Sequence, residues 1–340
     1  MQDKPILRVL PLGFPWKTQD PFLFCVYHKD DYPAGNDQLG PEASLAGRNL
    51  GNDFTIKNGW RMYHGKEVPG FPAHPHRGFE TVTIVNEGFV DHADSTGATA
   101  RFGEGDVQWI TSGKGLQHSE MFPLLNQRQP NPLVLFQIWL NLPKANKMVE
   151  PYFKMLWSDT IPIIKEKDVG GNQTTIQLIA GQLFGVKAPS PTPDSWAANP
   201  DHEVAIYNVK MEPGAVWTLP VASEKVNRSL YYYQGETLKI AGLEMHQDHA
   251  FELNPTHAIT LENGEVESRM LVLQGKPINE PVYQHGPFVM NSQQEIYDAF
   301  EDYKNTEFGG WPYDSPAPVH AREKGRFAQF GDGTVVEKSA

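Results

Sequence analysis

The chain has 340 residues, 39% of them hydrophobic, which is enough for about two domains with sizeable cores. Its net charge of −12 disfavours binding to a phosphate backbone, so we expect no direct nucleic-acid binding. The 30 glycines and 28 prolines favour short strands joined by tight turns over a helical bundle.

The first half of the chain contains several runs that are typical of strands. Residues 22–27 are apolar throughout and predict a buried strand. Residues 33–53 are rich in Gly, Pro, Asn and Asp and predict a long surface loop. Strands are also expected at 81–85, which is β-branched, and at 107–111. Residues 133–142 (LVLFQIWLNL) are apolar on both faces and predict a central, fully covered strand.

The second half begins with a segment that predicts a crossing between two domains. Residues 143–175 contain three prolines and a Gly-Gly pair, and residues 185–201 form a Pro-rich stretch that predicts an exposed loop. Further strands are expected at 175–179, 204–209, 229–233, 258–261 and 270–273. The expected parts are an N-terminal domain (1–145), a C-terminal domain (146–310) and a tail (311–340) whose Trp and Pro content predicts that it packs.

One helix is expected near the end of the chain. Ser292 and Glu295 have the spacing of a capping box, in which both side chains satisfy amide protons of the first helical turn. Ile296, Phe300 and Tyr303 then recur on one face. We expect this helix to pack against a barrel.

Two short segments hold a candidate metal site. His74 and His76 lie two residues apart in one segment, and His118 and Glu120 lie two apart in the other. Alternate side chains of a strand point to the same face, so two such strands facing inward would bring four donors together. Imidazoles and a carboxylate suit Fe(II), Mn, Co, Ni, Cu or Zn, and the lack of Cys ligands argues against a closed structural zinc site. We predict one mononuclear centre with positions open to substrate, O2 or water.

Other polar residues near these segments have more than one interpretation. Glu80 shares its parity with the first histidine pair, so strand geometry does not exclude it as a ligand. His92 and Asp94 repeat the two-residue spacing, but a hydrogen-bonded pair is favoured over a second metal site. Gln137 lies within an apolar run and either lines the pocket or bonds to backbone in the core.

The second half of the chain contains no comparable motif. His246, His249 and His257 are scattered among Asp and Glu at spacings unlike those of the first half. We interpret them as surface or loop histidines and expect the second domain to be structural and metal-free.

The sequence also indicates a compartment. The only cysteine is Cys25, which excludes an intrachain disulfide and suits a reducing environment. The first ten residues lack the pattern of a signal peptide, and no run approaches 18 apolar residues. We therefore expect a cytoplasmic protein that does not contact membranes.

The residues around the two pairs resemble those of a known family. The order G-x3-H-x-H-x3-E, from Gly70 to Glu80, and G-D-x8-G-x2-H, from Gly105 to His118, resembles the two-part cupin motif. The fuller text HPHRGFETVT, GDVQW, TSGKG and HSE resembles pirins, a bicupin branch. The segments FQIWLNL, EPVYQHGPFVMN and GGWPYDSPAPVHAREKGRFA extend the resemblance over most of the chain.

The resemblance implies a fold and a ligand set. The fold is all-β, with two antiparallel cupin (jelly-roll) barrels packed face to face and a short C-terminal helix. Fe(II) is expected in the N-terminal barrel, held by His74, His76, His118 and Glu120. General cupins use the first-motif glutamate as a ligand, whereas pirins use the later one. Glu80 is therefore expected to accept a hydrogen bond beside the ligands.

The resemblance also implies an activity. Pirin relatives have quercetin 2,3-dioxygenase activity, in which O2 opens the flavonol ring and carbon monoxide is released. We expect this reaction on a flavonol-like substrate in a monomer, with Glu120 also acting as the catalytic base. The alternative is a non-enzymatic metal-binding regulator that binds a transcription factor or a metabolic enzyme. A third hypothesis is a cupin that isomerises or binds a sugar acid.

Overall fold

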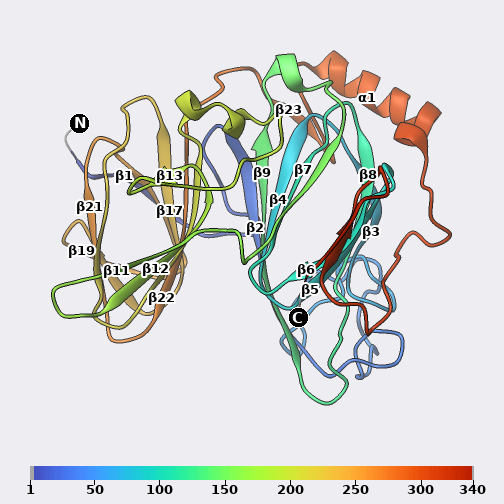
Figure 1. The fold of residues 1–340 in the computed structure, drawn as a ribbon, viewed down its shortest axis with the longest axis horizontal. Coiled ribbons are helices and arrows are strands. Elements are labelled where there is room, and N and C mark those ends of the chain that lie inside the picture. Colours follow the sequence, from blue (N-terminus) through green and yellow to red (C-terminus); the bar gives the residue numbers. More distant parts are fainter. Residues whose placement is uncertain (1–3, 339–340) are drawn as a thin grey trace. The chain divides into compact units, whose positions relative to one another are not determined.

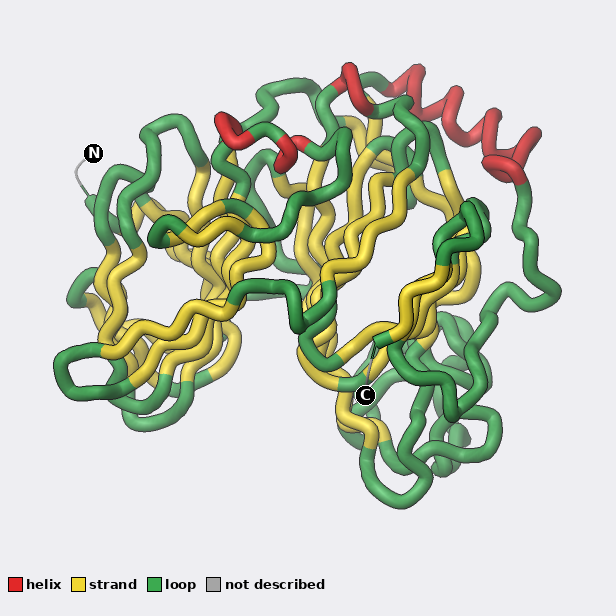
Figure 2. The backbone as a smooth tube through the Cα atoms, viewed as in Figure 1, coloured by secondary structure: helices red, strands yellow, loops and turns green. Residues whose placement is uncertain are grey.

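The computed structural model describes residues 4–338 and confirms the expected all-β, two-domain cupin fold (Figures 1 and 2). The chain forms two compact units. The first barrel consists of Tyr27–Ser158 together with residues 280–338. The second barrel consists of residues 4–26 together with Asp159–Asn279. No helix among the described residues is long and apolar enough to span a membrane.

Two antiparallel sheets form the first barrel. The five-stranded sheet has the order β10 (Tyr152–Leu156), β7 (Val107–Thr111), β4 (Phe79–Glu87), β9 (Asn131–Asn141) and β2 (Phe22–Tyr32). The six-stranded sheet has the order β26 (Val335–Glu337), β25 (Phe327–Gln329), β6 (Thr99–Gly103), β5 (Phe89–Asp94), β8 (Leu116–Met121) and β3 (Gly70–His76). Within 133–142 every residue except Gln137 is buried, which confirms the prediction of a covered inner strand.

Two further sheets form the second barrel. The seven-stranded sheet has the order β1 (Ile6–Pro11), β20 (His249–Leu253), β17 (Asn227–Gln234), β22 (Ser268–Gly275), β15 (Ala205–Met211), β12 (Gln173–Ala180) and β11 (Ile163–Lys167). The four-stranded sheet has the order β16 (Val216–Leu219), β21 (Ile259–Asn263), β18 (Thr237–Ile240) and β19 (Leu243–His246). Alternate residues of β12 are buried (Thr174, Ile176 and Leu178), so period-two patterning supplies the core.

Short elements complete the two barrels. The hairpin β13 (Gln182–Leu183) and β14 (Val186–Lys187) and the 3₁₀ helices Trp196–Ala198 and Pro200–His202 lie in or beside the predicted exposed loop of the second barrel. The first barrel carries the hairpin β23 (Tyr283–His285) and β24 (Phe288–Met290), and the 3₁₀ helices Lys144–Asn146 and Glu307–Gly309.

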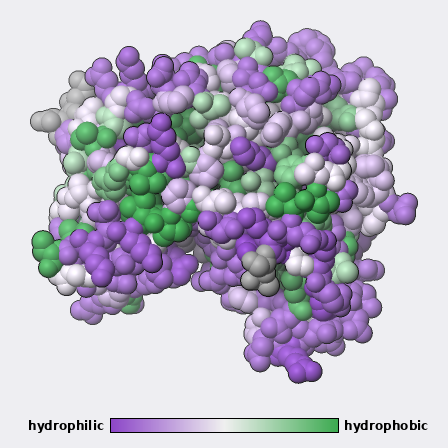
Figure 3. Space-filling model, in the orientation of Figure 1, coloured by the Kyte–Doolittle hydropathy of each residue, from purple (hydrophilic) through white to green (hydrophobic). Residues whose placement is uncertain are grey.

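In the view of Figure 3, apolar surface gathers on the left, over part of the second barrel.

The units differ from the expected boundaries at both ends of the chain and in the middle. β1 was assigned to the N-terminal domain, but it pairs with β20 of the second barrel. The segment predicted as a crossing contains β10, which pairs with β7, so the first barrel extends to Ser158 rather than to residue 145. These pairings are hydrogen bonds between distant segments, and local residue patterns do not reveal them.

The helix α1 (Gln293–Thr306) belongs to the first barrel. The expected boundaries had placed it in the C-terminal domain, and that assignment is wrong. The capping box of the helix forms in part: Ser292 Oγ accepts from the Glu295 amide at 3.2 Å, whereas Glu295 Oε2 accepts from the amide of Asn291 at 2.8 Å. Ile296 is buried in a cluster that includes Phe288 of β24, which confirms packing on a barrel.

The described part of the tail also packs on the first barrel. β25 pairs with β6, and the buried Arg101 of β6 donates to the carbonyl oxygens of His320, Ala321 and Lys324 at 2.7–3.0 Å. Arg101 in turn forms a two-pronged ion pair with the buried Asp91. The prediction that this segment packs is therefore confirmed.

Candidate metal centre

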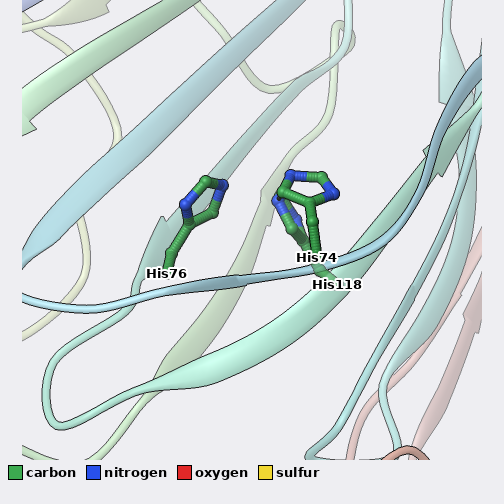
Figure 4. Close-up of side chains that lie close together, drawn as sticks. All are labelled: His74, His76 and His118. Atoms are coloured by element: carbon green, nitrogen blue, oxygen red, sulfur yellow. Dashed lines mark hydrogen bonds between the residues drawn. The ribbon is translucent and has the colours of Figure 1, made fainter. Parts of the chain in front are cut away.

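Three histidines meet on the inner face of the first barrel. His74 of β3 lies directly opposite His118 of β8, and His76 follows on the same face of β3. The Nε2 atoms of His74 and His118 are 3.0 Å apart, and one ring nitrogen from each of the three lies within 4.8 Å of the others. Figure 4 shows the three imidazoles directed to the same side of the two strands.

A glycine allows these two strands to approach closely. Gly70 begins β3 with φ +129°, and any Cβ there would collide with the backbone of Glu120 and Met121. Only glycine tolerates both this conformation and this contact. The first glycine of the motif therefore sets the approach on which the histidine pairing depends.

Burial keeps the three imidazoles neutral. Desolvation lowers the pKa of His74 to about 4, and it lowers the pKa values of His76 and His118 well below their usual range. His74 Nδ1 lies 2.9 Å from the carbonyl oxygen of Pro72, which places the proton on Nδ1 and leaves the Nε2 lone pair directed at the cluster. Neutral imidazole is the form that binds metal ions.

The unsatisfied ring nitrogens fit a metal ion better than a purely structural role. Among residues 4–338, no hydrogen bond of good geometry reaches either ring nitrogen of the buried His76 or Nδ1 of His118, although the backbone of Pro287 lies near enough to act on the pKa of His76. A buried polar atom without a partner costs about 1–3 kcal/mol. A hydrogen bond between His74 and His118 would account for one contact and leave His76 unsatisfied, whereas a cation would engage all three rings.

Glu120 borders the cluster without joining its closest group. Its Oε2 lies 3.8 Å from Nε2 of His118, and the carboxylate is buried. Thr83 Oγ1 donates to Oε1 at 3.2 Å, and Gln137 Nε2 donates to Oε2 at 2.6 Å. Burial raises the pKa of this carboxyl group. Its role as the fourth ligand therefore stays a prediction.

Glu80 lies apart from the histidines. It is fully buried on β4, in the opposite sheet, and its Oε1 accepts a hydrogen bond from Thr111 Oγ1 at 2.6 Å. Glu80 is an even number of residues from His74 and His76, which would place all three on one face of a continuous strand. It does not join the histidine cluster, because the chain passes from one sheet to the other between β3 and β4.

His92 and Asp94 form the hydrogen-bonded pair that was favoured. The atoms His92 Nε2 and Asp94 Oδ2 are 2.9 Å apart, and both residues are fully buried. On β5 they lie opposite Glu120 and His118 respectively, so the pair supports the strand that carries these two residues.

Gln137 lines the site, which settles the choice between its two interpretations. It donates to Glu120, and its Oε1 accepts from Nε1 of Trp139 at 3.2 Å. Trp139 also lies against the site: its ring centroid is 5.2 Å from that of His76 and 3.9 Å from that of Phe79.

The sequence analysis did not identify Trp139 or Thr83 as residues of the site. The spacing of Trp139, two residues after Gln137 on one strand face, is the signal that could have revealed it.

The histidines of the second barrel lie at its surface or in its loops. His246 is exposed, and His249 and His257 are half-buried. His249 Nδ1 lies 3.0 Å from the carbonyl oxygen of Gln247, a local contact. This placement confirms their interpretation as surface or loop residues, while the absence of a metal from this barrel stays a prediction.

The donor set suits a transition metal with open coordination positions. Imidazole and carboxylate ligands accommodate Fe, Mn, Co, Ni, Cu or Zn. The only cysteine of the chain, Cys25, is buried and lies outside this cluster, so no thiolate closes the site. His74 is half-buried whereas His76 and His118 are buried, so the cluster is most accessible on the side of His74.

Comparisons with known proteins agree with this fold and motif. The family model described as Pirin matches residues 45–140, and the Pirin C-terminal cupin domain matches residues 206–309. The chain is 36% identical to Pirin-1 of Arabidopsis thaliana over 71% of its length and 78% of that protein. It is 33% identical to Pirin of Homo sapiens over 73% of its length and 80% of that protein.

A solved structure extends the similarity over nearly the whole chain. A crystal structure of quercetin 2,3-dioxygenase from Acinetobacter baumannii matches with a TM-score of 0.70 and 25% identity, covering 90% of this chain and 98% of that one. With two family models matched and relatives above 30% identity aligned over most of their length, the chain belongs to the pirin family, a family of bicupins.

Proposed function

We propose that this protein is an iron-dependent dioxygenase that opens the heterocyclic ring of a flavonol such as quercetin, consuming O2 and releasing carbon monoxide. The observation that carries the proposal is the cluster of three neutral imidazoles beside a buried carboxylate, inside a barrel. The similarity to a structure named quercetin 2,3-dioxygenase supports the substrate class.

The proposed ligands are His74, His76, His118 and Glu120. Fe(II) held there would supply a Lewis-acid contact for a substrate oxygen and an electron source for O2. The buried aromatic rings of Phe79 and Trp139 stack beside His76 and limit water at that end of the site. Excluding water at this end of the site strengthens the electrostatic interaction between a bound substrate and the carboxylate of Glu120.

Glu120 is the proposed catalytic base. A flavonol must lose its ring hydroxyl proton before oxygen attack, and a carboxylate within the site is suited to accept it. Burial raises the pKa of Glu120 in the absence of a cation, which favours proton acceptance, whereas a bound cation would act to lower it. Gln137 and Thr83 hold one carboxylate oxygen each and so act as positioning residues.

Replacing each of two buried glutamates tests this assignment. Glu120→Gln removes the base while keeping its shape, and we expect flavonol turnover to fall at least about 100-fold. Glu80→Gln is the matched control, because Glu80 is equally buried but bonds to Thr111 in the opposite sheet. Full activity of Glu120→Gln, with metal content equal to that of the wild type, would remove Glu120 from the mechanism.

The reaction itself is tested with the iron-loaded protein in air and under anaerobic conditions. We expect flavonol loss only in the presence of O2, with one carbon monoxide released per flavonol consumed. Absence of turnover from the fully loaded protein would contradict the enzymatic proposal, and recovery of a bound transcription factor or metabolic enzyme would then favour the regulatory role.

A further inference from the structure

The second barrel contains a cavity of about 540 Å³ that no role assigned so far uses. A volume of this size lies within the usual range for small-molecule sites, about 300–1,000 Å³. Its inner wall includes the buried core residues Leu183, Tyr207 and Leu219, and its rim includes the exposed Phe184 and Val221. Apolar side chains therefore form part of the wall, and polar and charged side chains, among them Gln182, Lys187 and Glu203, line the rest.

One buried positive charge, that of Arg228, also lines this cavity. Arg228 is 3% exposed, and its hydrogen bonds go to neutral acceptors. Nε and Nη2 donate to Oε1 of Gln274 at 2.8 and 2.5 Å, and Nη1 donates to the carbonyl oxygen of Pro220 at 2.7 Å. A guanidinium has five N–H groups, so two of them have no partner among residues 4–338.

The other buried arginines differ from Arg228 in their partners. Arg61, Arg77 and Arg101 are equally buried, and each pairs with a carboxylate, that of Asp30, Asp302 or Asp91. In the described part of the chain Arg228 makes no such ion pair. Burial lowers the pKa of Arg228 to about 10, although the carboxylate of Glu203, which lines the same cavity, acts to raise it without forming an ion pair. A buried charge without a directly bonded counter-ion is costly, so this position favours an anion supplied by a ligand.

We propose that this cavity binds a small organic carboxylate, whose carboxylate group pairs with Arg228 and whose apolar body packs on Leu183, Tyr207 and Leu219. Two free N–H groups of one guanidinium match the two oxygens of a carboxylate. Lys187, exposed at the rim, adds a second positive charge that attracts an anion to a chain of net charge −12. The site lies in the second barrel, so it is independent of the dioxygenase proposal.

Calorimetric titration of the metal-loaded, full-length protein with cinnamate, and with the neutral cinnamamide, tests the proposal. We expect cinnamate to bind the wild type, and Arg228→Gln to weaken this binding about tenfold or more because the charge-assisted bonds are lost. Cinnamamide should bind both proteins equally weakly. Failure of the wild type to bind cinnamate, or equal affinity of Arg228→Gln, would overturn the proposal.

A second control separates this site from the candidate metal centre, since a carboxylate can also coordinate a metal ion. His118→Ala should retain full cinnamate affinity while losing its metal and any dioxygenase activity. Loss of cinnamate binding in His118→Ala would place the ligand at the metal and refute the assignment to Arg228.

A measurement on the wild-type chain covers the case in which Arg228→Gln does not fold. A photoreactive diazirinyl benzoate, cross-linked to the protein and mapped by mass spectrometry, should label residues in 181–191 or 219–222, which line the cavity. Labelling confined to 74–120 would contradict the proposal.

Discussion

Gln137→Leu is the most informative substitution at the candidate metal centre, because it leaves every proposed ligand in place. Gln137 Nε2 lies 2.6 Å from Glu120 Oε2, whereas Thr83 Oγ1 lies 3.2 Å from Oε1. A hydrogen bond to a charged group contributes about 1.5–3 kcal/mol. Each 1.4 kcal/mol of barrier is about tenfold in rate. If Glu120 is the base, we expect Gln137→Leu to lower kcat/KM about ten- to hundredfold, and Thr83→Val to lower it less.

The assay is steady-state flavonol loss in air, with metal content and thermal unfolding measured for each variant. Trp139→Phe is the control, because it removes the donor to Gln137 Oε1 while leaving the bond between Gln137 and Glu120 intact. It should have the smaller effect. A Gln137→Leu protein that binds a full complement of metal and keeps the wild-type kcat/KM would refute the positioning role.

Two further predictions concern stability. Arg101→Met should lower the free energy of unfolding, measured by urea titration, by about 3–5 kcal/mol, because it leaves Asp91 charged and buried. Lys210→Met, at a half-exposed ion pair, should change it by under about 1 kcal/mol. Equal effects of the two substitutions would contradict this prediction. His28, bonded to Tyr63, has its pKa lowered by burial to about 3, from 6.5. The folded state then binds fewer protons than the unfolded state between these values. His28 alone should therefore lower stability by about 1.4 kcal/mol per pH unit as pH drops from about 6.5 towards 3, in addition to the contribution of the buried histidines of the cluster. A His28→Gln protein whose slope equals that of the wild type would be evidence against this.

Local residue patterns were sufficient to predict several strands and the histidine cluster, but not β1, β10 or β11. Side chains alternate along a strand, so His74 with His76 and His118 with Glu120 had to share faces once each segment was extended. Gly70 supplied the close approach that the motif required. The covered strand at 133–142 was equally visible, because a strand buried on both faces is apolar on both.

Long-range pairing determined what these patterns left open. β1 joins β20 and β10 joins β7 through backbone hydrogen bonds, which are the same for every residue type and so leave no mark on the local sequence. The link from Gln137 to Glu120 depends on two sheets facing each other across the barrel interior. Nothing in the local sequence distinguishes Arg228 from an exposed arginine; only the fold buries it beside a cavity with no ion-pair partner among the described residues. Burial and partners are properties of the packed barrel, because they arise only when segments distant in the chain come together.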